Sequence, residues 1–237
     1  MTVEDIKELA QQGNVRAMAA MGEYYSGMSK AGTPNREKAL YYYKLAAEAG
    51  DVQGTVEMVM ASEHDLALAS IMAERGEIYP ELDKIAEEAI RWAKLLETNL
   101  QGTGTEGGLM DFAKRQQVQV FCKVSVLYYR AENYEGMIWA AQKLDHPLAK
   151  AIGGLAKYRL ATTGVQMQEA CEMLKYIEDP LCWSKDYQTK HSLTLLLDAA
   201  NCLSKIYAEL CNDVNSAYQI LTETLNRIVD EKTRKKT

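Results

Sequence analysis

The chain has 237 residues, of which 47% are apolar and 25% are charged, and this composition excludes an intrinsically disordered protein. Its net charge of −6 is modest and its one basic run lies at residues 234–236, so we expect no nucleic-acid partner. The presence of only four prolines, without sustained alternation of apolar and polar residues, argues against a β-rich fold. We therefore expect an all-α protein.

From the N-terminal residues we expect no secretory signal peptide. Residues 1–12 lack the basic start and apolar centre of a signal peptide, and no segment approaches the length of a membrane span. We therefore expect a cytoplasmic protein with no membrane partner. In a reducing compartment the five cysteines, which have no C-x-x-C spacing, are interpreted as thiols that pack as small apolar side chains rather than as metal ligands or disulfides. These residues are Cys122, Cys171, Cys182, Cys202 and Cys211.

Thr2 and Asp5 have the spacing of a capping box, with an acid in place of the usual Glu or Gln. They predict a short N-terminal helix that caps the fold. Two stretches of helical period follow between Gly13 and Gly50, separated by a break rich in Gly, Pro and Asn. Small residues recur along both stretches, which predicts an antiparallel helix pair with a small-residue seam.

Residues 13–50 resemble the Sel1-like repeat, a relative of the tetratricopeptide repeat. The positions that carry the resemblance are Ala17, Met21, Gly22, Tyr25, Ala39, Tyr42, Tyr43, Ala46, Ala47 and Gly50. One departure is that the loop glycine of the family would fall on Met28, whereas this chain has Gly27 followed by a longer insert. The resemblance implies an α-solenoid that works as an adaptor, holding proteins together in signalling or quality-control assemblies.

A second repeat is predicted because segment 50–54 reproduces segment 13–17 about 37 positions later. The helix that should pair with it carries a small residue and an aromatic residue at Ala89 and Trp92. These positions are too far along the chain for a simple repeat. We therefore expect an extra helical segment over residues 65–78.

The glycine-rich segment 101–108 is predicted to be a flexible linker. It follows the N-terminal Sel1-like repeats of residues 1–100, which include the capping helix and the inserted helix. It precedes C-terminal repeats of tetratricopeptide or Sel1-like type, residues 109–237, which end in a second capping helix. We expect one solenoid of about five antiparallel helix pairs wound as a right-handed superhelix.

Helix pairs are predicted after the linker from small-residue signatures that begin at Cys122, Ala151 and Ala199. The spacing between the two helices of each pair is shorter than in the first half of the chain, so we expect tight turns. Residues 178–190 interrupt the period with a proline and several polar residues, and we interpret them as a longer connection.

Gly22, Ala156 and Ser204 share the repeat phase at which a first helix approaches its neighbour most closely. A large side chain at these positions would separate the helices. The last helix runs from about Val214 to Asp230. Its predicted buried face consists of Ala217, Ile220, Leu221, Leu225 and Ile228.

Three features that suggest chemistry are set aside. His64 lies between acidic residues but has no second His four positions away, so zinc chemistry of the HExxH type is excluded and a solvated surface is expected. Segment 102–107 follows a helix and lacks a Gly-Lys-Ser/Thr ending, which argues against nucleotide binding. The tyrosine runs 41–43 and 128–129 are expected to pack mainly in the core, because consecutive helical side chains point 100° apart. We predict no catalytic residue, cofactor or metal site.

The first functional hypothesis is a non-catalytic scaffold whose first helices line a concave groove that selects a protein or peptide partner. By phase with the repeat, the groove should present a set of polar and aromatic side chains. They are Arg16, Glu23, Tyr24, Lys150, Lys157, Asp198 and Lys205. They carry both signs of charge, so the sequence predicts no particular charge for the ligand.

Two alternatives from other classes stay open. Some secreted members of the family that are rich in paired cysteines look like β-lactam-binding or hydrolytic enzymes, although this chain has neither a signal peptide nor a cysteine pair in each repeat. A structural homo-oligomer would instead stack its terminal helices end to end and so continue the solenoid.

Overall fold

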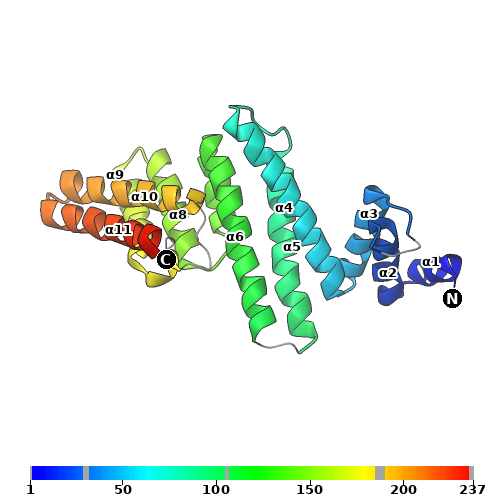
Figure 1. Cartoon of the computed structure of the whole chain (residues 1–237). Coiled ribbons are helices and arrows are strands. Elements are labelled where there is room, and N and C mark those ends of the chain that lie inside the picture. Colours follow the sequence, from blue (N-terminus) through cyan, green and yellow to red (C-terminus); the bar gives the residue numbers. More distant parts are fainter. Residues whose placement is uncertain (1, 29–31, 105–106, 185–189, 235–237) are drawn as a thin grey trace. The chain divides into compact units, whose positions relative to one another are not determined.

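The computed structural model describes residues 2–28, 32–104, 107–184 and 190–234 (Figure 1). Over these residues the chain is all-α, as predicted, and consecutive helices pack against each other. None of the helices in these ranges combines the length and the apolar composition needed to cross a membrane.

The helices follow one another with short connections. The α-helices are α1 (Val3–Gln11), α2 (Val15–Ser26), α3 (Arg36–Glu48), α4 (Val52–Glu74), α5 (Leu82–Gly102), α6 (Gly108–Arg130), α7 (Tyr134–Ala141), α8 (Pro147–Leu160), α9 (Gly164–Leu174), α10 (Lys190–Lys205) and α11 (Val214–Arg234). Two 3₁₀ turns follow α9 and a π-helical turn follows α10. These turns are η1 (Lys175–Glu178), η2 (Pro180–Trp183) and η3 (Ile206–Leu210).

The chain forms two compact units. The first consists of Met1–Glu74 and Tyr79–Gln117, and the second of Arg75–Ile78 and Val118–Thr237. The boundary between these units lies inside α6, and the division of the repeats at segment 101–108 stays a prediction.

The two neighbouring helices extend into the ends of segment 101–108. α5 continues to Gly102 and α6 begins at Gly108, so only five residues separate them, of which 105 and 106 lie outside the described residues. A glycine costs a helix only about 1 kcal/mol relative to alanine. Packing of the adjoining Leu100, which is 2% exposed, outweighs that cost and extends α5 into the glycine-rich stretch. The flexibility of this stretch stays a prediction.

α4 is one helix of 23 residues, so the extra helical segment predicted over residues 65–78 does not exist as a separate element. Its buried side chains follow one continuous helical stripe with alternating steps of four and three residues. They are Thr55, Val59, Ser62, Leu66 and Ala69. Because no proline or glycine interrupts the chain between Gly54 and Gly76, the polar residues around His64 do not end the helix.

Side-chain caps begin the N-terminal helices. The capping box predicted at α1 is present: the Asp5 amide donates to Thr2 Oγ1 over 3.2 Å, and the Thr2 amide donates to Asp5 Oδ2 over 2.7 Å. Asn14 accepts a hydrogen bond from the Ala17 amide at the start of α2, and Asn35 caps α3 in the same way. Each cap satisfies an amide that the helix itself leaves unpaired.

A buried amide ties α3, α4 and α5 together. Asn99 on α5 is 8% exposed, and its Nδ2 donates to the Ala47 carbonyl over 2.9 Å and to Thr55 Oγ1 over 2.8 Å. Trp92 and Leu96 pack beside it in the apolar core of the first unit. Because both donors of the amide are used, this polar group is buried without the cost of a lost hydrogen bond.

The seam positions predicted from the repeat phase are confirmed. Gly22 is buried, and a Cβ there would lie 2.5 Å from the Tyr43 ring. Ala156 is fully buried, and Ser204 is 7% exposed and donates to the Ala217 carbonyl over 3.1 Å. Helices therefore approach closely at these three positions, as the small side chains require.

The face predicted for α11 is only partly correct. Ala217 and Ile220 are buried, but Leu225 is 51% exposed, and Thr224 takes a buried position instead at 4% exposure. The buried face of the helix therefore consists of Ala217, Ile220 and Thr224, and the Ala217 carbonyl accepts a hydrogen bond from Ser204 on α10. The predicted buried residues Leu221 and Ile228 are half-buried at the edge of this face.

A pair of glycines allows a test of the close approach. A Cβ at Gly154 would lie 2.8 Å from the Leu174 amide nitrogen, which belongs to the backbone and cannot move aside, whereas a Cβ at Gly164 would meet nothing within 4 Å. We predict that Gly154→Ala lowers the free energy of unfolding by about 1–3 kcal/mol, although alanine is the better helix former. Gly164→Ala, the matched control, should leave it unchanged or raise it. Urea unfolding measures both, and equal effects of the two variants would contradict the packing described for α8 and α9.

Candidate interaction surface

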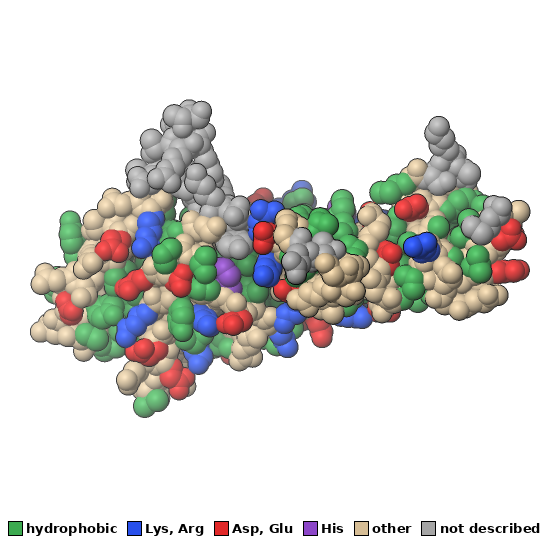
Figure 2. Space-filling model, turned by 90° about the horizontal axis from the view of Figure 1, so that it is seen from below, with side chains coloured by type: hydrophobic (Ala, Val, Ile, Leu, Met, Phe, Trp, Pro, Cys, Tyr) green, Lys and Arg blue, Asp and Glu red, His purple; other side chains and the backbone are tan. Residues whose placement is uncertain are grey.

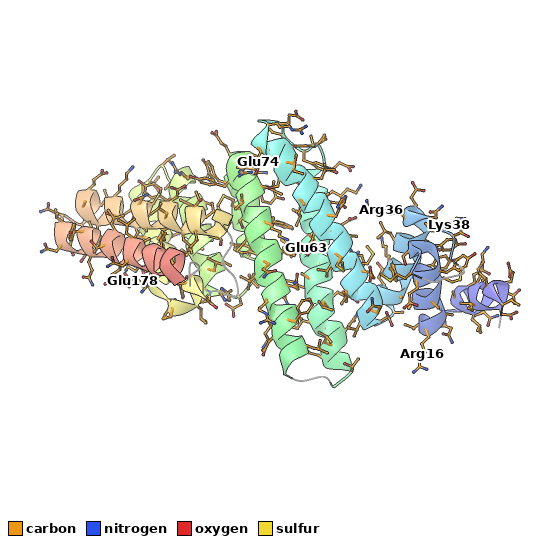
Figure 3. All side chains as sticks on the ribbon, in the orientation of Figure 1. Arg16, Arg36, Lys38, Glu63, Glu74 and Glu178 are labelled. Atoms are coloured by element: carbon orange, nitrogen blue, oxygen red, sulfur yellow. The ribbon has the colours of Figure 1, made fainter. Side chains whose placement is uncertain are left out.

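The three groove residues predicted in the first unit all lie on α2. Arg16 and Glu23 are exposed, and Tyr24 is half-buried with its hydroxyl 3.3 Å from Thr33 Oγ1. Figure 3 shows Arg16 at the opposite end of the α2 and α3 pair from Arg36 and Lys38. Arg16 is therefore separated from the polar residues at the start of α3.

Most of the groove residues predicted in the second unit are engaged in contacts within that unit. The amine of Lys150 lies 3.0 Å from Asp145 Oδ1, and that of Lys157 lies 3.2 Å from Glu169 Oε2. Lys205 is exposed. Three of the seven predicted residues belong to the first unit and four to the second, so within neither unit do they form one complete site.

Asp198, predicted to face a partner, instead takes part in a hydrogen-bond network across three helices. Tyr129 on α6 donates its hydroxyl to Asp198 Oδ2 on α10 over 2.6 Å, and Arg159 on α8 donates to the same hydroxyl over 3.2 Å. Burial, together with the hydrogen bond to Asp198 and the charge of its carboxylate, raises the pKa of Tyr129 to about 12. The phenol is therefore a donor at physiological pH and joins these helices.

The network predicts that loss of the Tyr129 hydroxyl lowers the stability of the protein measurably. Tyr129→Phe should lower the free energy of unfolding by about 1–2 kcal/mol, because the half-buried Asp198 carboxylate loses its donor. Tyr134→Phe is the matched control. The centroid of the Tyr134 ring lies 6.3 Å from that of Tyr129, so this variant removes a neighbouring hydroxyl without removing the donor to Asp198. Denaturant unfolding with Asp198→Ala in a double-mutant cycle should give a coupling energy for the Tyr129 and Asp198 pair. A coupling of zero would contradict this role.

His146 caps α8 through its ring. The Nδ1 atom accepts a hydrogen bond from the Leu148 amide over 3.2 Å, which requires that nitrogen to be unprotonated. Burial lowers the pKa of His146 below its ordinary value of 6.5, and this outweighs the opposing effects of the Asp179 and Asp145 carboxylates. Asp145 is itself paired with Lys150. The folded protein therefore favours the neutral imidazole of His146.

The His146 cap predicts a pH dependence of stability. Because the folded pKa is lowered, the unfolded chain binds the proton more tightly, so stability is complete above about pH 6.5 and falls as the pH drops towards the folded pKa. His146→Asn keeps a capping oxygen but does not titrate. We expect the difference in unfolding free energy between wild type and His146→Asn to change between about pH 7.5 and pH 5, as measured by urea unfolding. A constant difference would show that the histidine does not contribute.

The first unit contains a surface cleft with a volume of about 360 Å³. It lies where the end of α2, the first half of α3 and the first half of α4 meet. The residues that line it are Tyr25, Ser26, Pro34, Asn35, Arg36, Ala39, Leu40, Tyr43, Glu57, Met60 and Ala61. Its wall is largely apolar and aromatic, and Met60 at its edge is 59% exposed.

A row of tyrosines extends from the cleft over α2 and α3. The Tyr25 ring stacks on Tyr42 with centroids 5.8 Å apart and planes 11° apart. Tyr24 meets Tyr25 edge to face at 5.1 Å, and Tyr41 meets Tyr42 in the same way at 5.2 Å. Tyr42 is buried, whereas Tyr41 is 59% exposed. The tyrosine row therefore joins the core to the surface beside the cleft.

Charged groups of both signs surround the cleft. Arg36 lies 3.9 Å from Asp65, with both side chains largely exposed, and Lys38 lies over the Tyr25 ring at 5.2 Å. Glu57 accepts a hydrogen bond from Gln53 over 2.9 Å. On the face shown in Figure 2, basic and acidic side chains also lie among hydrophobic ones. Neither sign dominates, so apolar contact and not charge would decide what enters the cleft.

The described residues contain no group of three or more His, Cys, Asp or Glu side chains that could hold a metal ion. The cysteines are free: Cys211 is exposed, contrary to the packing role predicted for all five, and the other four are buried as predicted. Burial raises the pKa of Cys122 and of Cys182 to about 12, and both thiols are therefore protonated.

Comparisons of the chain with protein-family models, with curated proteins and with solved structures give no match. The description of the cleft therefore rests on the geometry of this chain alone. Of the lining residues, Tyr25, Ala39 and Tyr43 are among the repeat positions recognised in the sequence, whereas Met60 and Ala61 are not. The signal for Met60 is an apolar residue that lies off the buried stripe of α4, and it is recognisable only once α4 is known to be one continuous helix.

Proposed function

We propose that this protein is a non-catalytic interaction scaffold, an adaptor whose first unit holds a protein or peptide partner by an apolar side chain inserted into the cleft. The observation that carries the proposal is the cleft itself, with Tyr25, Leu40 and Met60 among its lining residues. Clefts of this volume that combine apolar walls with a few polar groups are typical binding sites.

The tyrosine row supports the same function. Tyrosine is enriched at protein interfaces because it offers a large contact area, loses little conformational entropy and keeps one polar end. Tyr41 is exposed at the end of the row, and Tyr25 lines the cleft. A partner that fills the cleft would thus contact a rigid aromatic surface beside it.

The resemblance of residues 13–50 to Sel1-like repeats supports an adaptor role, and we propose membership of that family on this basis. We also propose a cytoplasmic location, supported by the five free cysteines, which are typical of a reducing compartment. Among the described residues, no particular group of side chains supports the enzyme alternative.

Selection from a random peptide library tests the proposal. We expect immobilised wild-type protein to enrich peptides with a large apolar residue, and their affinity to fall at least about tenfold for Met60→Glu, because a charge would then lie at the edge of the apolar wall. Val165→Glu is the matched control, since Val165 is 71% exposed on α9 in the second unit. Fluorescence polarisation measures the affinities. Failure to enrich any peptide, or equal binding by the two variants, would contradict the cleft as the site.

A further inference from the structure

α11 has two apolar faces, of which its own unit covers one. Ala217, Ile220 and Thr224 are buried on the inner face against the rest of the second unit. A second series of apolar residues lies along the neighbouring face. This outer seam consists of Val214, Tyr218, Leu221, Leu225 and Ile228. Val214, Tyr218 and Leu225 are 66%, 72% and 51% exposed, and the other two are half-buried.

The spacing of the outer seam is that of a coiled coil. Successive members stand four, three, four and three residues apart, a mean period of 3.5 residues. Scattered exposed apolar residues are normal on a protein surface, but a regular series along about four turns of a helix is a packing surface. The heptad period specifies its partner as another helix lying alongside α11, with apolar residues at the same period.

The residues beside the seam bear on which helix could pack against it. Among the described side chains, the heptad positions that flank the seam on the solvent side are occupied by Asn215 and Thr222, neither of which is charged. The other flank is formed by Ala217 and Thr224 of the inner face. At these four flanking positions no charge selects an acidic or a basic helix, and none would repel an identical helix.

We propose that the outer seam of α11 packs against the outer seam of a second copy of this chain, forming a homodimer through a two-helix interface. A second copy supplies a helix with the same heptad period and the same uncharged flank. Five apolar side chains on each of two helices bury on the order of 1,000 Å² in total, the lower limit for a specific interface. This pairing side by side differs from an end-to-end stack, because it closes at two copies.

The interface is independent of the proposed adaptor function. The cleft lies in the first unit and α11 in the second, so loss of one activity leaves the other measurable. A dimer would present two copies of the cleft, and it would thereby raise the effective affinity for a partner that carries two matching segments.

Sedimentation equilibrium over about 1–100 µM tests the pairing at the concentrations where an interface of this size associates. Wild type should shift from the mass of one chain to twice that mass. Tyr218→Lys should stay monomeric over the same range, because it places a charge in the middle of the seam. Gln219→Lys is the matched control and should dimerise like wild type, since Gln219 is exposed outside the seam and pairs with Glu223.

Leu225→Glu gives an independent second disruption of the seam and should also stay monomeric. Circular dichroism melting shows whether each variant is folded, and Tyr218 and Leu225 are exposed enough for both substitutions to leave the fold intact. A wild type that is monomeric at about 100 µM overturns the proposal, as does dimerisation of folded Tyr218→Lys or Leu225→Glu to the wild-type extent. Growth beyond two copies would also overturn it, in favour of end-to-end stacking.

Discussion

The first unit depends on how closely α2 and α4 approach Tyr43. A Cβ at Gly22 would lie 2.5 Å from the Tyr43 ring, and a Cβ at Gly54 would lie 2.8 Å from the Tyr43 carbonyl oxygen. Glycine at both positions lets one residue of α3 contact the helices on either side. The Tyr43 hydroxyl also donates to Ser26 Oγ over 3.4 Å, and Tyr43 lines the cleft. The packing that holds three helices together therefore also shapes the cleft.

The second unit uses the same kind of contact at other positions. A Cβ at Gly136 on α7 would lie 2.7 Å from the Tyr128 ring on α6, and Gly154 on α8 faces the backbone of α9. The hydrogen bonds of Tyr129 then join α6 to α8 and α10. Close packing at glycine is thus combined with a polar network. The network specifies which helices lie side by side in a unit whose core is largely apolar.

Both proposed surfaces consist of apolar side chains that the fold leaves uncovered. On α4 the buried stripe turns Met60 outwards, and on α11 burial of Ala217 and Thr224 turns Tyr218 and Leu225 outwards. In each case a helix carries more apolar residues than its own unit can bury. On α4 the uncovered apolar residue borders a cleft, and on α11 the uncovered apolar residues form a heptad seam. The cleft suits a single inserted side chain, whereas the seam suits a second helix.

The sequence by itself determined the helical class, the capping box at Thr2, and the small-residue positions Gly22, Ala156 and Ser204. These depend on local period and on side-chain size, which neighbouring residues already define. Only the tertiary structure decided that α4 is continuous, that Asp198 accepts the Tyr129 hydroxyl, and that Leu225 is exposed. The contact of Asp198 and the exposure of Leu225 depend on how far a helix is rotated against neighbours distant in the chain, whereas the continuity of α4 is shown by the one buried stripe along its length. A rotation of a few tens of degrees exchanges buried and exposed positions without changing the periodicity that the sequence displays.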